Sequence, residues 1–117
     1  MPGGPAHPSV PTIDASAFRG TELARPGTWA VAFLADWCPF CRSFAPKFDA
    51  LEGQGFDLAH GDVNSESSPL WHDFDIKVVP TVVVFRDGQP IFRANGRYLR
   101  GLSDRDLAAI VAAARPS

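Results

Sequence analysis

The run from Trp29 to Ala35 is apolar at every position and is bounded by Thr28 and Asp36. A strand with one wet face would alternate apolar and polar residues, whereas an unbroken run fits a strand buried on both faces. Such a strand needs a parallel neighbour and helices on both sides of its sheet. The run therefore predicts an α/β domain with this strand at its centre. Its seven residues are too few for a membrane-spanning helix, which needs about 20.

A second β-branched run, Val78 to Phe85, predicts another strand of the same sheet. Asp87-Gly88 follows it as a hairpin turn signal and leads to a strand that begins near Ile91. Shorter apolar patterns predict two more strands, Val10 to Ile13 and Phe56 to Val63. In the latter strand Phe56, Leu58 and His60 share one face.

Capping residues and apolar spacing predict four helices. They run from Asp14 to about Ala24, from near Pro39 to about Gly53, from Ser68-Pro69 to Phe74, and from Ser103 to about Ala114. The second carries an apolar stripe of Phe40, Phe44, Phe48 and Leu51 and is interrupted by Pro46. The element order is βαβαβ followed by ββα, which is typical of an α/β sandwich with a mixed central sheet.

The composition describes an ordinary globular domain. The length of 117 residues suits one domain, and the net charge of −2 gives no general attraction to nucleic acid or to acidic membranes. Residues 1–9 are proline-rich and lack the basic start and apolar stretch of a secretory signal, so we expect a flexible tail before a single domain at 10–117. The default expectations are a cytoplasmic, monomeric protein with no nucleic-acid or membrane partner.

Cys38 and Cys41 are the only cysteines, and they stand between the buried strand and the first turn of the second helix. The amino end of a helix favours negative charge, and the thiolate is the reactive form of cysteine. We therefore predict that Cys38 is the attacking residue and that Cys41, one turn deeper, is the resolving residue that closes a disulfide. This disulfide would be the redox group, and we expect no other cofactor.

Two other interpretations of the pair stay open. A structural zinc site normally needs four Cys or His ligands, and only His7, His60 and His72 are available to complete one, at no recognisable spacing. An inert buried pair is the second alternative. The position of the CxxC motif directly after an apolar strand favours redox chemistry over both, and we expect no metal.

The chain resembles the thioredoxin family from about Val10 to Ala114. The resemblance rests on Phe33 to Cys41, on Pro46 five residues after the second cysteine, and on Phe74 to Phe85 with the following Asp87-Gly88. It implies the thioredoxin fold, a central mixed sheet with helices on both faces. It also implies a thiol-disulfide oxidoreductase that reduces protein disulfides. An electron-donating reductase would then reduce its own disulfide again.

The resemblance also implies roles for individual residues. Pro80 is expected to be cis and to face the disulfide, which leaves the backbone of Val79 free to pair with an extended client. Pro39 supports the active site. Client contacts are expected from Trp37, Phe40, Val79, Pro80 and a glycine before the last helix. Gly101 fits that glycine if the last hairpin is long, and Gly96 fits it by ungapped counting.

Several positions depart from the thioredoxin pattern. Pro39-Phe40 stands between the cysteines in place of Gly-Pro, which predicts a less strongly reducing pair. Ala32 replaces the buried aspartate that helps to deprotonate the resolving thiol, and His60 matches the position of a buried lysine near that aspartate. His60 could accept the proton in its place, or it could be a core histidine without a chemical role. Asn64 matches a carboxylate that bonds the active-site indole, so it is expected to receive the Trp37 N–H.

Two other functions stay open beside disulfide reduction. The same chemistry could run in the opposite direction, in an oxidase or isomerase outside the cytoplasm. Alternatively, the fold could serve as a binding module without catalysis.

Overall fold

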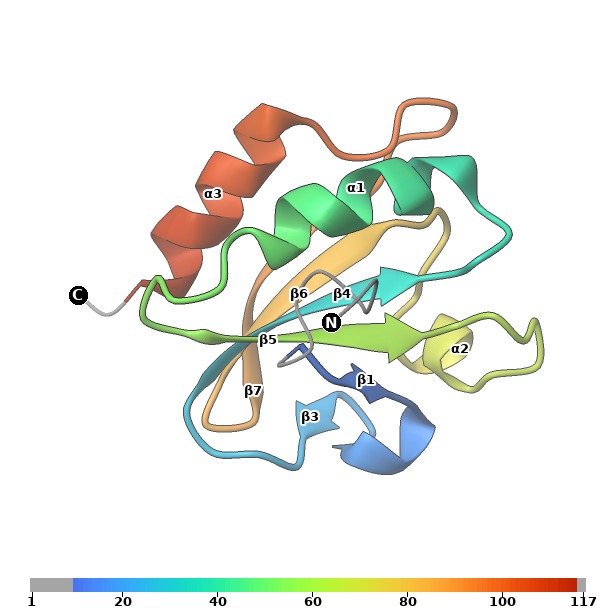
Figure 1. The fold of residues 1–117 in the computed structure, drawn as a ribbon. Coiled ribbons are helices and arrows are strands. Elements are labelled where there is room, and N and C mark those ends of the chain that lie inside the picture. The colour runs from blue at the N-terminus through green and yellow to red at the C-terminus, as the bar shows by residue number, and fades with distance from the viewer. Residues whose placement is uncertain (1–9, 116–117) are drawn as a thin grey trace, which may run out of the picture.

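In the computed structural model, which describes residues 10–115, five strands form one mixed sheet in the order β1-β5-β4-β6-β7 (Figure 1). The strands are β1 (Thr12–Ile13), β4 (Thr28–Leu34), β5 (Asp57–Asp62), β6 (Thr81–Arg86) and β7 (Gln89–Ala94). The central strand β4 pairs in parallel with β5 and antiparallel with β6. The apolar run at Trp29 was thus correctly assigned to the middle of the sheet.

Two long helices, α1 (Pro39–Asp49) and α3 (Asp104–Ala114), cover one face of the sheet, and the short α2 (Leu70–Asp73) lies on the other (Figure 1). Ser103 and Asp106 form the predicted capping box at the start of α3. Cys38 is the N-cap of α1 and Pro39 its first residue, as the sequence predicted. Pro46 lies inside α1, on its exposed side.

The predicted helix from Asp14 to Ala24 is wrong. Asp14 does cap a helical turn, with its carboxylate accepting from the Ser16 N–H, but that turn is a short 3-10 helix, η1 (Ala15–Ala17). A small hairpin of β2 (Phe18–Arg19) and β3 (Glu22–Leu23) follows. Gly20 adopts φ 60° at the bend, a conformation that glycine reaches at little cost and that ends a helix.

Each face of β4 has its own apolar core. Ala30 and Ala32 point toward α1 and α3, where Phe44, Phe48 and Ile110 are buried. Val31 and Phe33 point to the opposite face, and the Phe33 ring lies 5.1 Å from the ring of Phe74 and 5.9 Å from that of Phe18. Phe18 and Leu23 of the small hairpin thus cover the sheet in place of the predicted helix.

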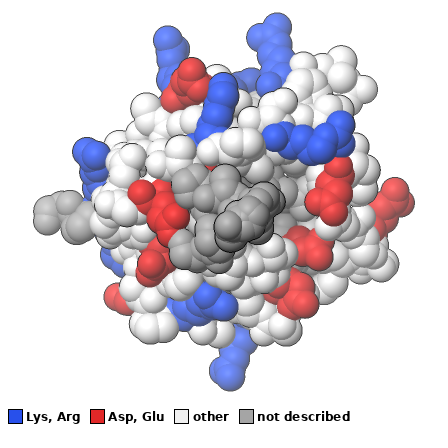
Figure 2. Space-filling model, viewed as in Figure 1, with Lys and Arg blue, Asp and Glu red and all other residues white. Residues whose placement is uncertain are grey.

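The Asp87-Gly88 turn is confirmed: both residues have positive φ, 49° and 90°, and they join β6 to β7. Within residues 10–115 no helix is long and apolar enough to cross a membrane. Basic and acidic side chains are interspersed over the face shown in Figure 2, in keeping with the small net charge.

Candidate active site

The two cysteines lie at the amino end of α1, where the segment after β4 leads into the helix. Cys38 is 6% exposed and Cys41 is 2% exposed, and both are free thiols. Backbone hydrogen bonds fix the turn between them, since the Cys41 N–H donates to the Cys38 carbonyl at 3.1 Å. The Cys38 thiol donates to the Val79 carbonyl oxygen at 3.5 Å. The first sulfur is therefore held against the segment that precedes β6.

Burial is the main influence on the second sulfur. Burial, opposed by a backbone hydrogen bond with Ala35 and aided by a hydrogen bond with the Cys38 side chain, raises the pKa of the Cys41 thiol to about 12. Burial is a property of the position, so it persists when Cys38 carries a client. Almost none of Cys41 is thiolate at neutral pH under these conditions, and its attack needs a proton acceptor.

The segment opposite Cys38 is the loop that enters β6. The Val79–Pro80 peptide bond is cis. Val79 and Pro80 are both buried, and the Thr81 hydroxyl donates to the Val78 carbonyl at 2.7 Å, which fixes the loop to its own strand. The structure thus places Val79, and the cis Pro80 that follows it, beside Cys38.

The two candidate glycines both lie at the site, but against different neighbours. Gly96 lies against the backbone of Pro80, and a Cβ atom there would collide with the Pro80 carbonyl oxygen. Gly101, with φ 68°, lies against Phe40, and a Cβ atom there would approach the Phe40 Cβ to 3.1 Å. Gly96 therefore allows the loop from Asn95 to Leu102 to approach Pro80, while Gly101 lets its other end approach α1.

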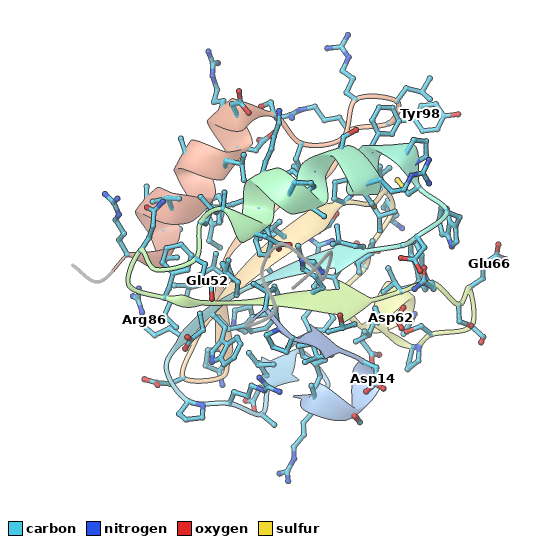
Figure 3. The ribbon with its side chains drawn as sticks, viewed as in Figure 1. Asp14, Glu52, Asp62, Glu66, Arg86 and Tyr98 are labelled. Atoms are coloured by element: carbon cyan, nitrogen blue, oxygen red, sulfur yellow. The ribbon has the colours of Figure 1, made fainter. Side chains whose placement is uncertain are left out.

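Trp37 is the exposed aromatic side chain of the site, with 55% of its surface accessible. Its indole N–H donates to the backbone carbonyl of Asn64 at 3.0 Å. Asn64 was predicted to receive this N–H, and it does so with its main chain, because its side-chain oxygen accepts from the Asp36 N–H at 2.5 Å. Tyr98 and Leu99 add exposed apolar surface from the loop after β7 (Figure 3).

Trp71 also lies at the site, although the sequence analysis assigned it no role there. Its ring stacks on that of Trp37, with centroids 6.3 Å apart and planes at 12°. Its own N–H donates to the Ser65 carbonyl at 3.0 Å. The stack holds the exposed Trp37 ring in one orientation beside Cys38.

If the chain reduces protein disulfides, as the resemblance implies, replacing Trp71 by leucine should raise the KM for such a substrate with little change in kcat. An aromatic pair contributes about 0.5–1.5 kcal/mol beyond the area it buries, which corresponds to about a 2- to 10-fold change. Steady-state kinetics with a reducible protein substrate measure both constants. Trp29→Leu is the matched control, because Trp29 stands at the opposite end of β4, its indole N–H bonded to the Pro26 carbonyl. An equal KM effect from both variants would contradict a role for the stack.

His60 lies on β5 toward α1, in register with Ala32 of β4 and Thr12 of β1. Its Nε2 atom is 2.6 Å from Oδ1 of Asp49, the last residue of α1. The two side chains are 23% and 14% exposed. His60 also lines, together with Cys41, a cavity of about 240 Å³ between α1 and β5. The resemblance placed His60 near the resolving cysteine, but it gave no role to Asp49.

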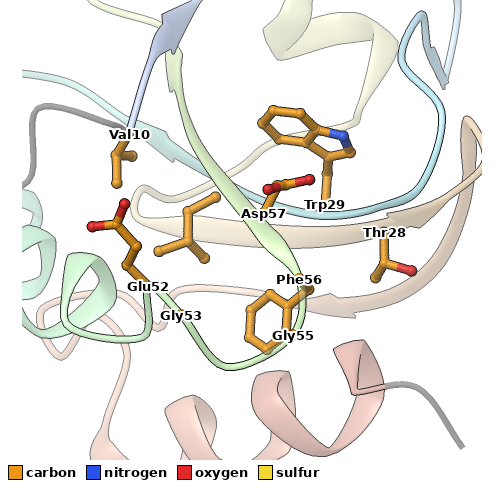
Figure 4. Close-up of a pocket in the computed structure, with 9 residues that line it drawn as sticks. Val10, Thr28, Trp29, Glu52, Gly53, Gly55, Phe56 and Asp57 are labelled. Carbon is orange, nitrogen blue, oxygen red and sulfur yellow. The ribbon is translucent and has the colours of Figure 1, made fainter.

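A larger hollow of about 490 Å³ lies at the other end of the sheet, where β4 and β5 begin (Figure 4). Trp29, Glu52, Phe56 and Asp57 are among the residues that line it, and no cysteine or histidine is among them. In the described part of the chain, no group of three or more His, Cys, Asp or Glu side chains is placed to hold a metal ion. His7, one of the candidate zinc ligands, lies outside the described residues.

Comparison with known proteins places this geometry in a family. A family model described as Thioredoxin matches residues 9–112. The chain is 35% identical to a thioredoxin of Mycolicibacterium smegmatis over 83 residues, which cover 63% of this chain and 74% of that protein. It is 28% identical to a chloroplastic F-type thioredoxin of Brassica napus, a match covering 92% of this chain and 63% of that protein.

Longer proteins match over a smaller part of their length. Protein disulfide-isomerase 1 of Caenorhabditis elegans is 35% identical over 72 residues, and the match covers 57% of this chain and 15% of that protein.

Among solved structures, spinach chloroplast thioredoxin f (short form) superposes with a TM-score of 0.69 at 25% identity. The superposition covers 90% of this chain and 93% of the spinach chain. The fold expected from the sequence is confirmed.

Proposed function

Because the chain belongs to the thioredoxin family, we propose that it reduces protein disulfides by dithiol–disulfide exchange through Cys38 and Cys41. The observation that carries this proposal is the position of the two free thiols, at the amino end of α1 and beside Val79. The dipole of a helix favours negative charge, such as that of a sulfur anion, at its amino end.

The reaction takes place in two exchanges. The Cys38 thiolate attacks a client disulfide, forms a mixed disulfide and releases the first client sulfur as a thiolate, which takes up a proton. The Cys41 thiol then loses its proton and attacks the Cys38 sulfur, and the second client sulfur leaves and is protonated in turn. The client gains two electrons and two protons, and the pair is left as a Cys38–Cys41 disulfide.

Apolar surface around Cys38 provides the client contacts. Trp37 is exposed, Phe40 is half-buried at the start of α1, and Gly101 lies against Phe40. An extended client segment can pair with the backbone of Val79 beside Pro80 while its disulfide reaches Cys38. Small apolar surfaces of this kind suit transient docking of many clients.

The cycle needs a source of electrons to reopen the Cys38–Cys41 disulfide. One similar structure is a complex of a thioredoxin f2 with ferredoxin:thioredoxin reductase; that thioredoxin is 25% identical to this chain, with a TM-score of 0.70. By analogy, a dedicated reductase is the electron donor of this chain. Reduction of clients requires a reducing compartment, so we assign the protein to the cytoplasm. The protein acts as a monomer. Its own disulfide is its only redox cofactor.

The reduction potential tests the direction of the reaction. We expect a value between about −270 mV, as in thioredoxin, and about −200 mV, because Pro39-Phe40 replaces the Gly-Pro of thioredoxins. Equilibration with glutathione buffers followed by alkylation measures it, and an insulin-reduction assay measures turnover. A potential of about −180 mV or higher, with no insulin reduction, would contradict the proposal and favour an oxidase or isomerase.

A further inference from the structure

One face of α1 connects the resolving cysteine to an ion pair. Cys41, Ala45 and Asp49 follow one another at four-residue spacing, so they lie along the same side of the helix. His60 faces this side from β5, with its Nε2 atom 2.6 Å from the Asp49 carboxylate and its ring 6.0 Å from that of Phe48. The small side chain of Ala45 leaves room between His60 and Cys41.

That room is the cavity of about 240 Å³, which Cys41, Ala45 and His60 line together. A water molecule occupies about 30 Å³ in the liquid, so the space can hold several. Polar residues in its lining, among them Thr12, Asp62 and Asn64, provide groups that water can contact there. A proton can therefore pass from the Cys41 sulfur to the His60 ring through water.

We propose that His60, held and polarised by Asp49, accepts the proton of the Cys41 thiol through this cavity during resolution of the mixed disulfide. The inference rests on the proposed function and deepens it. Asp49 acts only as a positioning residue, because it contacts the imidazole and not the reacting sulfurs.

The hydrogen bond to Asp49 determines which nitrogen accepts. A carboxylate can only accept, so Nε2 carries the hydrogen and Nδ1 has the free lone pair. When Cys41 attacks, its proton moves to Nδ1, its sulfur bonds to the Cys38 sulfur, and the bond from Cys38 to the client sulfur breaks. The resulting imidazolium is stabilised by the Asp49 carboxylate and later returns its proton to water.

The other charged groups at the cavity are less suited to this step. Asp36 is exposed, and Asp62 already accepts hydrogen bonds from the backbone and side-chain N–H groups of Asn64, at 2.9 and 2.8 Å. Arg42 is a cation whose guanidinium donates to the Asp36 carbonyl at 2.8 Å. On the neighbouring strands β1 and β4, the register partners of His60 are Thr12 and Ala32, which carry no charge. Imidazole is also the side-chain type that most readily takes up and returns a proton near neutrality.

Stopped-flow reaction with 5,5′-dithiobis(2-nitrobenzoic acid) separates the two exchanges by absorbance. Attack by Cys38 releases one thionitrobenzoate in a first phase, and attack by Cys41 releases the second. In His60→Ala, and likewise in His60→Gln, the first phase should keep its rate while the second slows by about 10²-fold at neutral pH. The wild-type second phase should rise with pH as imidazole loses its proton and then level off. In the variants it should rise continuously and approach the wild-type rate at alkaline pH.

Matched variants separate chemistry from structure. His72→Ala removes an exposed histidine of α2 and should leave both phases unchanged. Asp49→Asn should slow the second phase and leave the first unchanged, because the imidazolium formed on proton transfer loses the carboxylate that stabilises it. The inference would be overturned if both His60 variants kept the wild-type rate and pH dependence of the second phase. A missing first phase in the wild type would instead overturn the proposed function.

A measurement on the unmodified protein covers the case in which neither His60 variant folds. Nitrogen-15 NMR of the histidine rings identifies which nitrogen carries the hydrogen. We expect His60 as the Nε2–H form, with neutral imidazole at the pH where the second phase levels off. An Nδ1–H form, or an imidazole that stays charged across that range, would overturn the inference.

Discussion

Replacing Cys38 by serine should abolish disulfide reduction, with a loss of more than about 10³-fold in turnover. The hydroxyl of serine stays protonated at neutral pH, so no nucleophile remains at the amino end of α1. The fold should be unaffected, because serine differs from cysteine by one atom. Insulin reduction measures the loss, and circular dichroism checks the fold.

Cys41→Ser is the matched control, and it should fail in a different way. Cys38 would still attack a client, but nothing would release it, so covalent Cys38–client adducts should accumulate and should dissolve on addition of dithiothreitol. Non-reducing gel electrophoresis after incubation with oxidised protein reveals them. If Cys38→Ser kept full function and Cys41→Ser trapped no adduct, the chain would be a binding module and not an enzyme.

The elements that the sequence predicted well are those with strong local signals. The unbroken apolar run at Trp29 made β4 central, Asp87-Gly88 defined the hairpin of β6 and β7, and Ser103 with Asp106 defined the start of α3. In each case a few adjacent residues determine the backbone, and tertiary packing only reinforces them. The failure at Asp14 has the opposite cause. A helix cap is present, but only one 3-10 turn follows it, and Phe18 and Leu23 pack on the sheet from a hairpin.

The residues of the site show the same contrast between local and long-range signals. Cys38, Cys41 and Pro80 were found because their motifs are contiguous in sequence. Trp71 and Asp49 act through neighbours that are distant in the chain, Trp37 and His60, so only the fold reveals the contacts. A signal for Asp49 did exist. Its four-residue spacing from Ala45 and Cys41 on one helix places it on the side of the resolving thiol.

The core beneath the site predicts a strong coupling between Phe33 and Gly61, which are register partners on β4 and β5. Phe33 is fully buried, and its ring covers Gly61 so closely that a Cβ atom there would lie 2.5 Å from the Phe33 Cδ1 atom. Phe33→Ala should therefore lower the free energy of unfolding by about 3–5 kcal/mol, since it removes the ring and leaves a cavity. Gly61→Ala should cost about 1–3 kcal/mol, since the ring must move.

The double variant distinguishes close packing from two independent losses. Once Phe33 is alanine, the methyl group of Gly61→Ala enters the space that the ring has left. Its cost should therefore fall by at least about 1 kcal/mol relative to the wild-type background. Urea unfolding of the wild type, both single variants and the double variant, in reducing buffer, gives the four free energies. Additive costs would show that the Phe33 ring does not restrict position 61, and that glycine is needed there for some other reason.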